Sequence, residues 1–216
     1  MFDVVTIARE YGSGGAEVGR RVAEMLGWEL VDRAIIERVA ALGKIDCVWA
    51  EEADEQSCAW WERVLRGFRH VWPEVYVGGV ADTGVDRDSL QKFTAHVVAE
   101  AGKTGNCVII GRSSQCVLRN EPRAMHVLVY APLAEKLERM KHRHPRESDL
   151  VGLLRRMDSE RHRYVQDYFG CDSADRKLYH LCLNSTMGID ACAELIVRGV
   201  RSSEMKQSST KEITAA

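Results

Sequence analysis

Short apolar runs alternate with amphipathic segments along most of this chain. Residues 3–8, 107–110 and 126–130 are apolar runs of strand length. After the first run, apolar residues such as Val18 and Val22 recur with the spacing of one helix face. Continuous apolar runs are typical of strands that are buried on both sides. The pattern therefore predicts an α/β fold in which helices cover both faces of a parallel sheet.

The same pattern predicts the order of the elements. Strands are expected at 3–8, 28–31, 107–110, 126–130 and 179–183, and helices at 16–27, 34–39, 90–101, from 133 onward, 148–168 and 188–200. In the helix that follows Pro132, we expect Leu133, Leu137 and Met140 to share one apolar face. Parallel strands end at one edge of their sheet, and ligands bind at that edge. Residues that follow a strand are therefore candidates for a site.

One segment interrupts this alternation. Residues 44–87 hold every tryptophan except Trp28, and we interpret them as a lobe inserted between two strands. The tryptophans are expected to pack inside that lobe, because tryptophan is mostly buried. We predict one domain over residues 1–201, followed by a disordered tail at 202–216 that is rich in Ser, Thr and Lys.

Charge, apolar runs and cysteine content indicate which classes of partner and which cellular location the sequence favours. With 32 acidic and 30 basic residues the net charge is −2, so bulk charge does not favour nucleic-acid or membrane binding. No apolar run approaches the ~18–20 residues of a membrane span. Seven cysteines without a C-x-x-C pair, and a start unlike a signal peptide, favour a cytoplasmic location with reduced thiols. The oligomeric state is left open.

A glycine-rich turn joins the first strand to the first helix. Its residues are Gly12, Ser13, Gly14 and Gly15, and Ala16 and Glu17 follow. Glycines let successive N–H groups point inward, and a helix N-terminus adds partial positive charge, so this order of elements favours phosphate. The turn departs from the pattern G-x-x-x-x-G-K-[ST], because Gly15 stands where lysine is expected. A tight turn without a ligand is the alternative.

Charged residues follow the other strands. Asp32 comes after the second strand, with Arg38 six residues on, and Arg112 directly follows the third. Further basic residues gather at 142–163. Guanidinium groups bind phosphate in a planar, bidentate way, so these arginines suit a phosphorylated ligand. Alternatively, Asp32 caps a helix, and the basic residues form a solvated helix face.

Taken together, these motifs resemble the cytidylate kinase-like proteins, a branch of the P-loop nucleoside monophosphate kinases. The motifs are Ile7 to Gly15, Leu30-Val31-Asp32 with Arg38, Val108 to Arg112, Asp158-x-x-Arg161 with Tyr164, and Leu183 to Thr186. The resemblance implies a P-loop NTPase-like parallel sheet flanked by helices. It also implies a helical lobe for the nucleoside monophosphate at 44–87, and an arginine-rich lid at 142–163.

Roles for individual residues follow from the same resemblance. Asp32, Arg38 and Arg112 resemble the residues that hold the acceptor, and the glycine turn from Gly12 to Glu17 resembles the site for the phosphates of ATP. Asp158 and Arg161 resemble the catalytic lid pair, and Arg156 lies beside them; a local ion pair is the alternative for Asp158 and Arg161. The resemblance places Asn184, Ser185 and Thr186 against the adenine, although a capping turn would use the same residue types.

The glycine turn departs from ordinary cytidylate kinases at two positions that matter for chemistry. Gly15 replaces the lysine that grips phosphate, and Glu17 replaces the residue that binds magnesium. We expect Arg9 or Arg20 to reach the phosphates instead, and Glu17 to help hold Mg²⁺. The predicted function is Mg²⁺-dependent phosphoryl transfer from ATP to a nucleoside monophosphate, with CMP or dCMP favoured. A kinase of another small molecule and a nucleotide-binding regulator without turnover are the alternatives.

Overall fold

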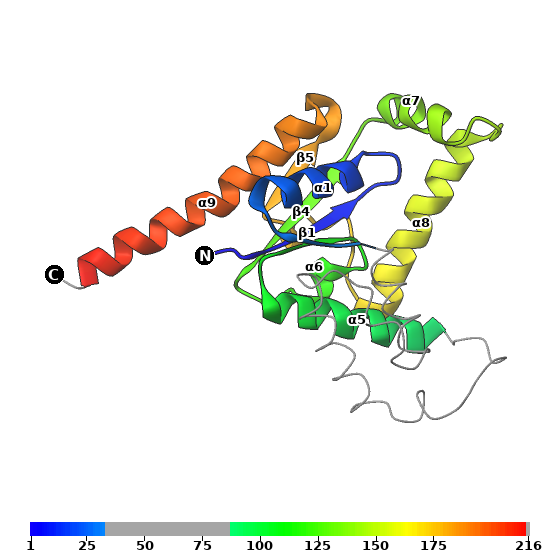
Figure 1. Cartoon of the computed structure of the whole chain (residues 1–216). Coiled ribbons are helices and arrows are strands. Elements are labelled where there is room, and N and C mark those ends of the chain that lie inside the picture. The colour runs from blue at the N-terminus through cyan, green and yellow to red at the C-terminus, as the bar shows by residue number, and fades with distance from the viewer. Residues whose placement is uncertain (33–86, 215–216) are drawn as a thin grey trace, which may run out of the picture.

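The structure is a computed structural model that describes residues 1–32 and 87–214 (Figure 1). Its centre is a five-stranded sheet in the order β2-β3-β1-β4-β5. The strands are β1 (Val4–Arg9), β2 (Glu29–Val31), β3 (Cys107–Ile110), β4 (Ala124–Tyr130) and β5 (Leu181–Asn184). Every neighbouring pair is parallel. The parallel sheet predicted from the apolar runs is confirmed.

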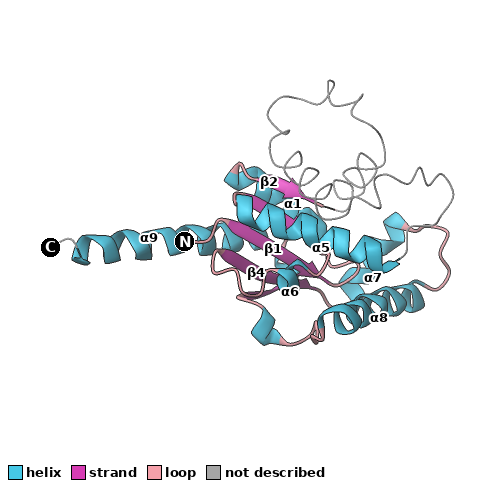
Figure 2. Cartoon of the chain, turned by 90° about the horizontal axis from the view of Figure 1, so that it is seen from below, coloured by secondary structure: helices cyan, strands magenta, loops and turns pink. Residues whose placement is uncertain are grey.

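Helices cover both faces of this sheet. They are α1 (Gly15–Leu26), α5 (Arg87–Thr104), α6 (Ser114–Val117), α7 (Leu133–Arg143), α8 (Leu150–Phe169) and α9 (Ile189–Thr214). Two short 3-10 helices, η2 (Arg176–Leu178) and η3 (Ser185–Met187), flank β5. In Figure 1, α1 and α9 lie on one side of the sheet and α5 on the other. Figure 2 looks from below onto α5 and α6, and both views show α9 projecting beyond the sheet.

Alternate residues of β1 enter the two cores. Val4 packs with α5 residues such as Val97, whereas Val5 packs with α1 and α9 residues such as Val22 and Ile196. All these side chains are buried. Because successive strand residues point to opposite faces, a strand covered on both faces is largely apolar, and the one buried polar residue of this run, Thr6, shares a hydrogen bond with His126. Burial on both faces explains the continuous run at the start of the chain.

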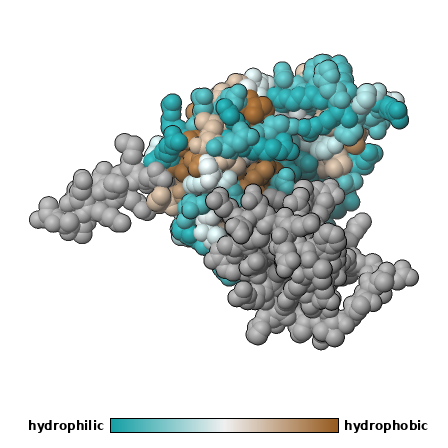
Figure 3. All heavy atoms as spheres, in the orientation of Figure 1, coloured by the Kyte–Doolittle hydropathy of each residue, from teal (hydrophilic) through white to brown (hydrophobic). Residues whose placement is uncertain are grey.

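The apolar face predicted for α7 is wrong in part. Met140 is fully buried as expected, but the side of the helix that faces inward includes Lys136, and Leu133 is 44% exposed. Acidic side chains from distant segments neutralise Lys136, as described below. The visible surface over α7 is mostly hydrophilic (Figure 3), in keeping with its exposed lysine and arginine side chains, among them Lys141 and Arg143.

The chain end also differs from the prediction. We expected a helix over 188–200 and then a disordered tail, but α9 continues to Thr214. No glycine or proline follows Gly199, and Glu204, Met205, Lys206 and Gln207 are all good helix formers. The sequence therefore offers no stop signal where we placed one.

Several predictions lie outside the described residues. These are the helix over 34–39, Arg38, and the inserted lobe at 44–87 except for Arg87, which begins α5. Within the described part of the chain, the helices all fall short of the length or apolar character that crossing a bilayer requires.

Candidate active site

A glycine turn connects β1 to α1 at the carboxyl edge of the sheet. The backbone N–H and the hydroxyl of Ser13 both donate to the carbonyl of Glu10, at 3.3 and 2.9 Å, which closes the turn. Gly12 and Gly14 both have φ near +79°, a backbone conformation that side chains strongly disfavour. The turn delivers the chain directly into the first turn of α1. Amide groups at a helix N-terminus attract anions, so the predicted phosphate cradle has a suitable backbone.

Side chains from other elements pack closely on this turn. A Cβ atom added to Gly12 would lie 3.0 Å from Met140, 3.2 Å from Leu154 and 3.3 Å from Lys136. A Cβ atom on Gly14 would lie 2.8 Å from Ile189. Helices α7, α8 and α9 therefore all contact the glycine turn, and larger residues cannot replace these glycines without displacing a neighbour.

The position of the missing lysine is occupied by Arg9. A Cβ atom on Gly15 would lie 2.6 Å from the Cβ of Arg9. The guanidinium of Arg9 extends to Gly111, where an added Cβ would lie 1.7 Å from its Nη1 atom. Two glycines thus make room for one arginine side chain. A lysine at position 15 would have to start in the space that Arg9 fills.

Three arginines converge beside the glycine turn. Burial, and after it the positive charges of Arg161 and Arg112, lower the pKa of Arg9 to about 10. Arg161 donates to the carbonyl of Arg9 at 3.1 Å and lies over the Tyr11 ring, 5.2 Å from its centroid. Asp32 and Glu17 lie near enough to act on the pKa of Arg9 in the opposite direction. The structure therefore brings together four of the predicted residues: Arg9, Asp32, Arg112 and Arg161.

The backbone around Arg112 is strained. Arg112 and Ser113 are consecutive residues in the left-handed region, with φ of 57° and 52°. Such conformations cost free energy outside glycine and cluster at functional sites. The Ser114 N–H donates to the Gly111 carbonyl at 3.1 Å and tightens this turn. The turn places Arg112 at the end of β3, beside Arg9.

A cavity of about 910 Å³ opens from the arginine cluster. Ala8, Leu128 and Tyr130 form part of its wall on the sheet, and α8 contributes Met157 and Tyr164. The volume lies in the range of small-molecule sites. The three arginines line the same cavity, so an anionic group bound to them has room for the rest of its molecule.

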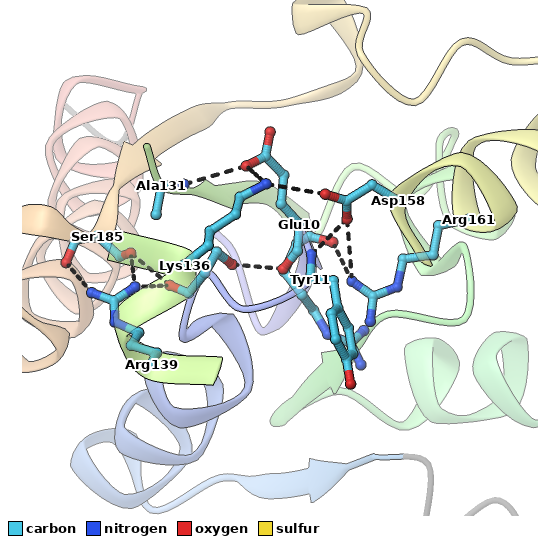
Figure 4. A network of polar contacts seen from close by, with 10 residues as sticks. Glu10, Tyr11, Ala131, Lys136, Arg139, Asp158, Arg161 and Ser185 are labelled. Carbon is cyan, nitrogen blue, oxygen red and sulfur yellow. Dashed lines mark hydrogen bonds and ion pairs between the residues drawn. The ribbon is translucent and has the colours of Figure 1, made fainter. Parts of the chain in front are cut away.

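Sequence interpretation missed Lys136, which is central to the contacts between α7, α8 and the glycine turn. Its ammonium nitrogen lies 2.7 Å from a Glu10 carboxylate oxygen and 3.0 Å from Asp158 Oδ2 (Figure 4). The other oxygen of Asp158 accepts the Tyr11 backbone N–H at 2.6 Å. Burial tends to lower the pKa of Lys136, but the bonds to Glu10 and Asp158 outweigh it and raise that pKa. The one available signal was the four-residue spacing between Lys136 and the buried Met140.

Arg139 was also missed. It donates to the Ser13 carbonyl at 2.9 Å, to the Ser185 hydroxyl at 2.9 Å and to the Ser185 carbonyl at 3.1 Å. The Ser185 hydroxyl itself donates to the Ser13 carbonyl at 2.6 Å. These bonds join the glycine turn to the loop after β5 through α7.

The remaining predicted residues are placed less centrally. Asn184 caps η3, because its side chain accepts the Thr186 N–H at 3.1 Å, and Thr186 is exposed. Glu17, the predicted magnesium ligand, pairs with Arg143 of α7. Arg156 is exposed on α8 and does not line the cavity, and Arg20 is exposed on α1. Of the two arginines expected to replace the missing lysine, the structure brings Arg9 to the glycine turn.

Comparison with solved structures identifies the fold. An uncharacterised protein from Eubacterium ventriosum ATCC 27560 is 18% identical with a TM-score of 0.60, covering 92% of this chain and 98% of that one. Shikimate kinase from Acinetobacter baumannii, in complex with shikimate, is 16% identical with a TM-score of 0.52, covering 94% and 95%. A gluconokinase from Sinorhizobium meliloti 1021 is 12% identical with a TM-score of 0.52, covering 96% and 97%. The five-stranded sheet and its helices thus form a kinase fold.

Comparison by sequence identifies the family. No protein of curated function matches significantly. Residues 4–187 match the model of the cytidylate kinase-like family, a range that includes the glycine turn, the arginine cluster and the loop after β5. This chain belongs to the cytidylate kinase-like family.

Proposed function

We propose that this protein is a phosphotransferase that moves the γ-phosphoryl group of ATP onto a nucleoside monophosphate, with CMP or dCMP as the favoured acceptor. The observation that carries this proposal is the convergence of Arg9, Arg112 and Arg161 beside the glycine turn. A donor phosphate on the turn and an acceptor phosphate on the arginines would meet at the carboxyl edge of the sheet. In-line transfer requires this arrangement of the two phosphates.

The charge of the cluster supports an anionic ligand. Burial and like charge both disfavour the protonated form of Arg9, and a bound phosphate would relieve that cost. In the transition state, negative charge spreads over the oxygens of the moving group, and fixed guanidinium groups stabilise it. Arg9 and Arg161 would supply that charge, while Arg112 with Asp32 would hold the acceptor.

The residues near the turn suit the proposed cofactors. Oxygen atoms are the ligands that Mg²⁺ prefers, and the Glu17 carboxylate in the first turn of α1 would supply one on exchanging its present partner, Arg143, for the ion. When bound, the ion would neutralise charge on the phosphates of ATP. Asn184 and Thr186, in the loop after β5, are accessible and would contact the adenine, while the buried Ser185 would hold that loop to the turn through Ser13 and Arg139.

A small hydroxylated acid is the second candidate acceptor. The solved relatives include a shikimate kinase in complex with shikimate and a gluconokinase. Arginines that grip a phosphate also grip a carboxylate, so the cluster fits either class of acceptor. A regulator without turnover is the weaker candidate, because Arg9, Arg112 and Arg161 all line the cavity and could stabilise a transferring phosphoryl group.

Direct assay of products tests the proposal. ATP and Mg²⁺ are incubated with a panel of nucleoside monophosphates, shikimate and gluconate, and ADP and the phosphorylated product are separated and measured. We expect CDP to form and Arg112→Ala to reduce its formation by about 10³-fold, the low end of the effect of a catalytic arginine. Arg119→Ala, an exposed arginine just beyond α6, is the matched control and should keep full activity. ATP consumption with shikimate or gluconate alone would transfer the proposal to that acceptor, and no product with any acceptor would refute it.

A further inference from the structure

The carboxylate of Asp158 lies where the glycine turn would receive an anion. One oxygen accepts the backbone N–H of Tyr11 at 2.6 Å, and the other accepts from Lys136 at 3.0 Å (Figure 4). A backbone amide of a glycine-rich turn and a nearby ammonium are the pair of donors that a phosphate needs. The protein's own carboxylate bridges both donors in this arrangement.

Lys136 differs from the other cations of α7. Its side chain is 10% exposed, against 30% for Arg139, 59% for Lys141 and 58% for Arg143. It also lies directly against Gly12, as the 3.3 Å approach to its added Cβ shows. A buried ammonium is costly unless paired, and here two carboxylates, Glu10 and Asp158, face a single ammonium. With both carboxylates bound to it, the Lys136 ammonium is not available to a phosphate on the turn.

A second cation, Arg161, lies close to the Asp158 carboxylate. Arg161 lies one helical turn further along α8, and its Nη1 atom is 3.9 Å from Asp158 Oδ1. A small shift of the carboxylate toward Arg161 would free both the Tyr11 N–H and the Lys136 ammonium. Because Asp158 and Arg161 share α8, the exchange would also change the position of an arginine that lines the cavity.

We propose that Lys136 is a phosphate-binding residue of the glycine turn and that Asp158 is an internal anion which occupies its site until a phosphate displaces it. The proposal deepens the proposed function, on which it rests for the presence of a phosphate-bearing donor. In this proposal Lys136 of α7 supplies the positive charge that a lysine at position 15 would otherwise supply. Entry of the donor would thereby release Asp158 toward Arg161.

Calorimetric titration of the full chain with inorganic tripolyphosphate tests this proposal without requiring turnover. Lys136→Met should weaken binding by roughly 10–100-fold, since a hydrogen bond to a charged group contributes ~1.5–3 kcal/mol. Lys141→Met, the same substitution on an exposed site of the same helix, should leave affinity unchanged. Lys136→Arg should restore most of the affinity, because it keeps the charge. Asp158→Asn should strengthen binding by roughly tenfold, because the competing anion loses its charge.

The outcomes separate this inference from the proposed function. Equal affinity of wild type and Lys136→Met, weaker binding by Asp158→Asn, or no binding by wild type would each overturn the inference. If the affinities change as expected but no acceptor is phosphorylated, the inference stands and the proposed function fails. Circular dichroism first establishes that each variant is folded; should Lys136→Met not fold, the direction of the Asp158→Asn effect decides.

Discussion

At the scale of single residues, the side chain of Arg9 determines which residue fits at position 15. A Cβ atom at position 15 would lie 2.6 Å from the Cβ of Arg9, so the space next to Arg9 suits only glycine. The sequence alone showed that the lysine of the usual pattern was absent. It could not show why, because the competing side chain belongs to a residue that the motif does not include.

Restoring the lysine should therefore harm the protein. We expect Gly15→Lys to destabilise the fold by about 1–3 kcal/mol through overpacking and to lower phosphoryl transfer. In an Arg9→Gly background the same substitution should cost measurably less, because the Cβ and Cγ atoms of Arg9 that it meets at 2.6 and 3.2 Å are then gone. Urea unfolding of the two single variants and the double variant measures the coupling. Additive costs would show that Arg9 does not compete with a side chain at position 15.

A buried histidine, His126, gives a second prediction at this scale. His126 Nδ1 and the Thr6 hydroxyl share a hydrogen bond of 2.8 Å, and the His126 backbone N–H donates to His180 Nδ1 at 2.9 Å. Burial, and then the charge of His180, lower the pKa of His126 to about 4. The unfolded chain, with a histidine pKa near 6.5, therefore binds more protons than the folded chain between these values.

Stability should accordingly be full above pH 6.5 and fall as the pH drops toward 4. From this histidine we expect a loss of about 2 kcal/mol between pH 7 and pH 5, at 1.36 kcal/mol per pKa unit. Urea unfolding at the two pH values measures it, and His126→Gln should reduce the difference. An exposed histidine, His142, replaced in the same way should leave the pH dependence as in the wild type.

At the scale of elements, helix α7 joins parts of the site that are far apart in sequence. Arg139 bonds both Ser13 of the glycine turn and Ser185 of the loop after β5. We expect Arg139→Ala to raise the KM for ATP by roughly tenfold with a smaller change in kcat. The bonds of Arg139 position the donor site, and the net contribution of about two hydrogen bonds corresponds to a tenfold change in affinity. Arg139→Lys should rescue it poorly, since one ammonium cannot reproduce the planar fork of a guanidinium. Steady-state kinetics with Lys141→Ala as the control makes the comparison. If Arg139→Ala lowered the melting temperature but left the KM for ATP unchanged, Arg139 would have a purely structural role.

The elements also show what could be predicted from the sequence. Continuous runs such as 107–110 predicted buried strands correctly, because burial on both faces strongly favours apolar side chains. The site was predicted where a residue directly follows a strand, as Arg112 does. Lys136 was not, because a lysine on a helix is usually exposed and its two acidic partners come from segments 126 and 22 residues away. Pairing across such distances is a property of the fold and leaves no local pattern.

At the scale of the whole molecule, two parts of the protein are held together by different forces. The sheet is fixed by cores on both faces, which include Val97 on one side and Val108 and Ile196 on the other. Helices α7 and α8 contact the glycine turn through Met140 and Leu154, which are 0% and 1% exposed, and through the ion pairs of Lys136. Because fewer apolar side chains hold them, these two helices should open at lower free energy than the sheet.

Leu154→Ala tests this division. Loss of a buried leucine typically lowers the free energy of unfolding by about 2–5 kcal/mol. Here it should mainly lower the free energy needed to detach α7 and α8 from the glycine turn. We expect hydrogen exchange to accelerate in α7 and α8 while the amides of β1 and β3 remain protected, and ATP to slow exchange in the two helices. Ile196→Ala, which removes a similar volume from the main core, should instead accelerate exchange in the sheet. If both variants produced the same pattern, the helices and the sheet would be one cooperative unit.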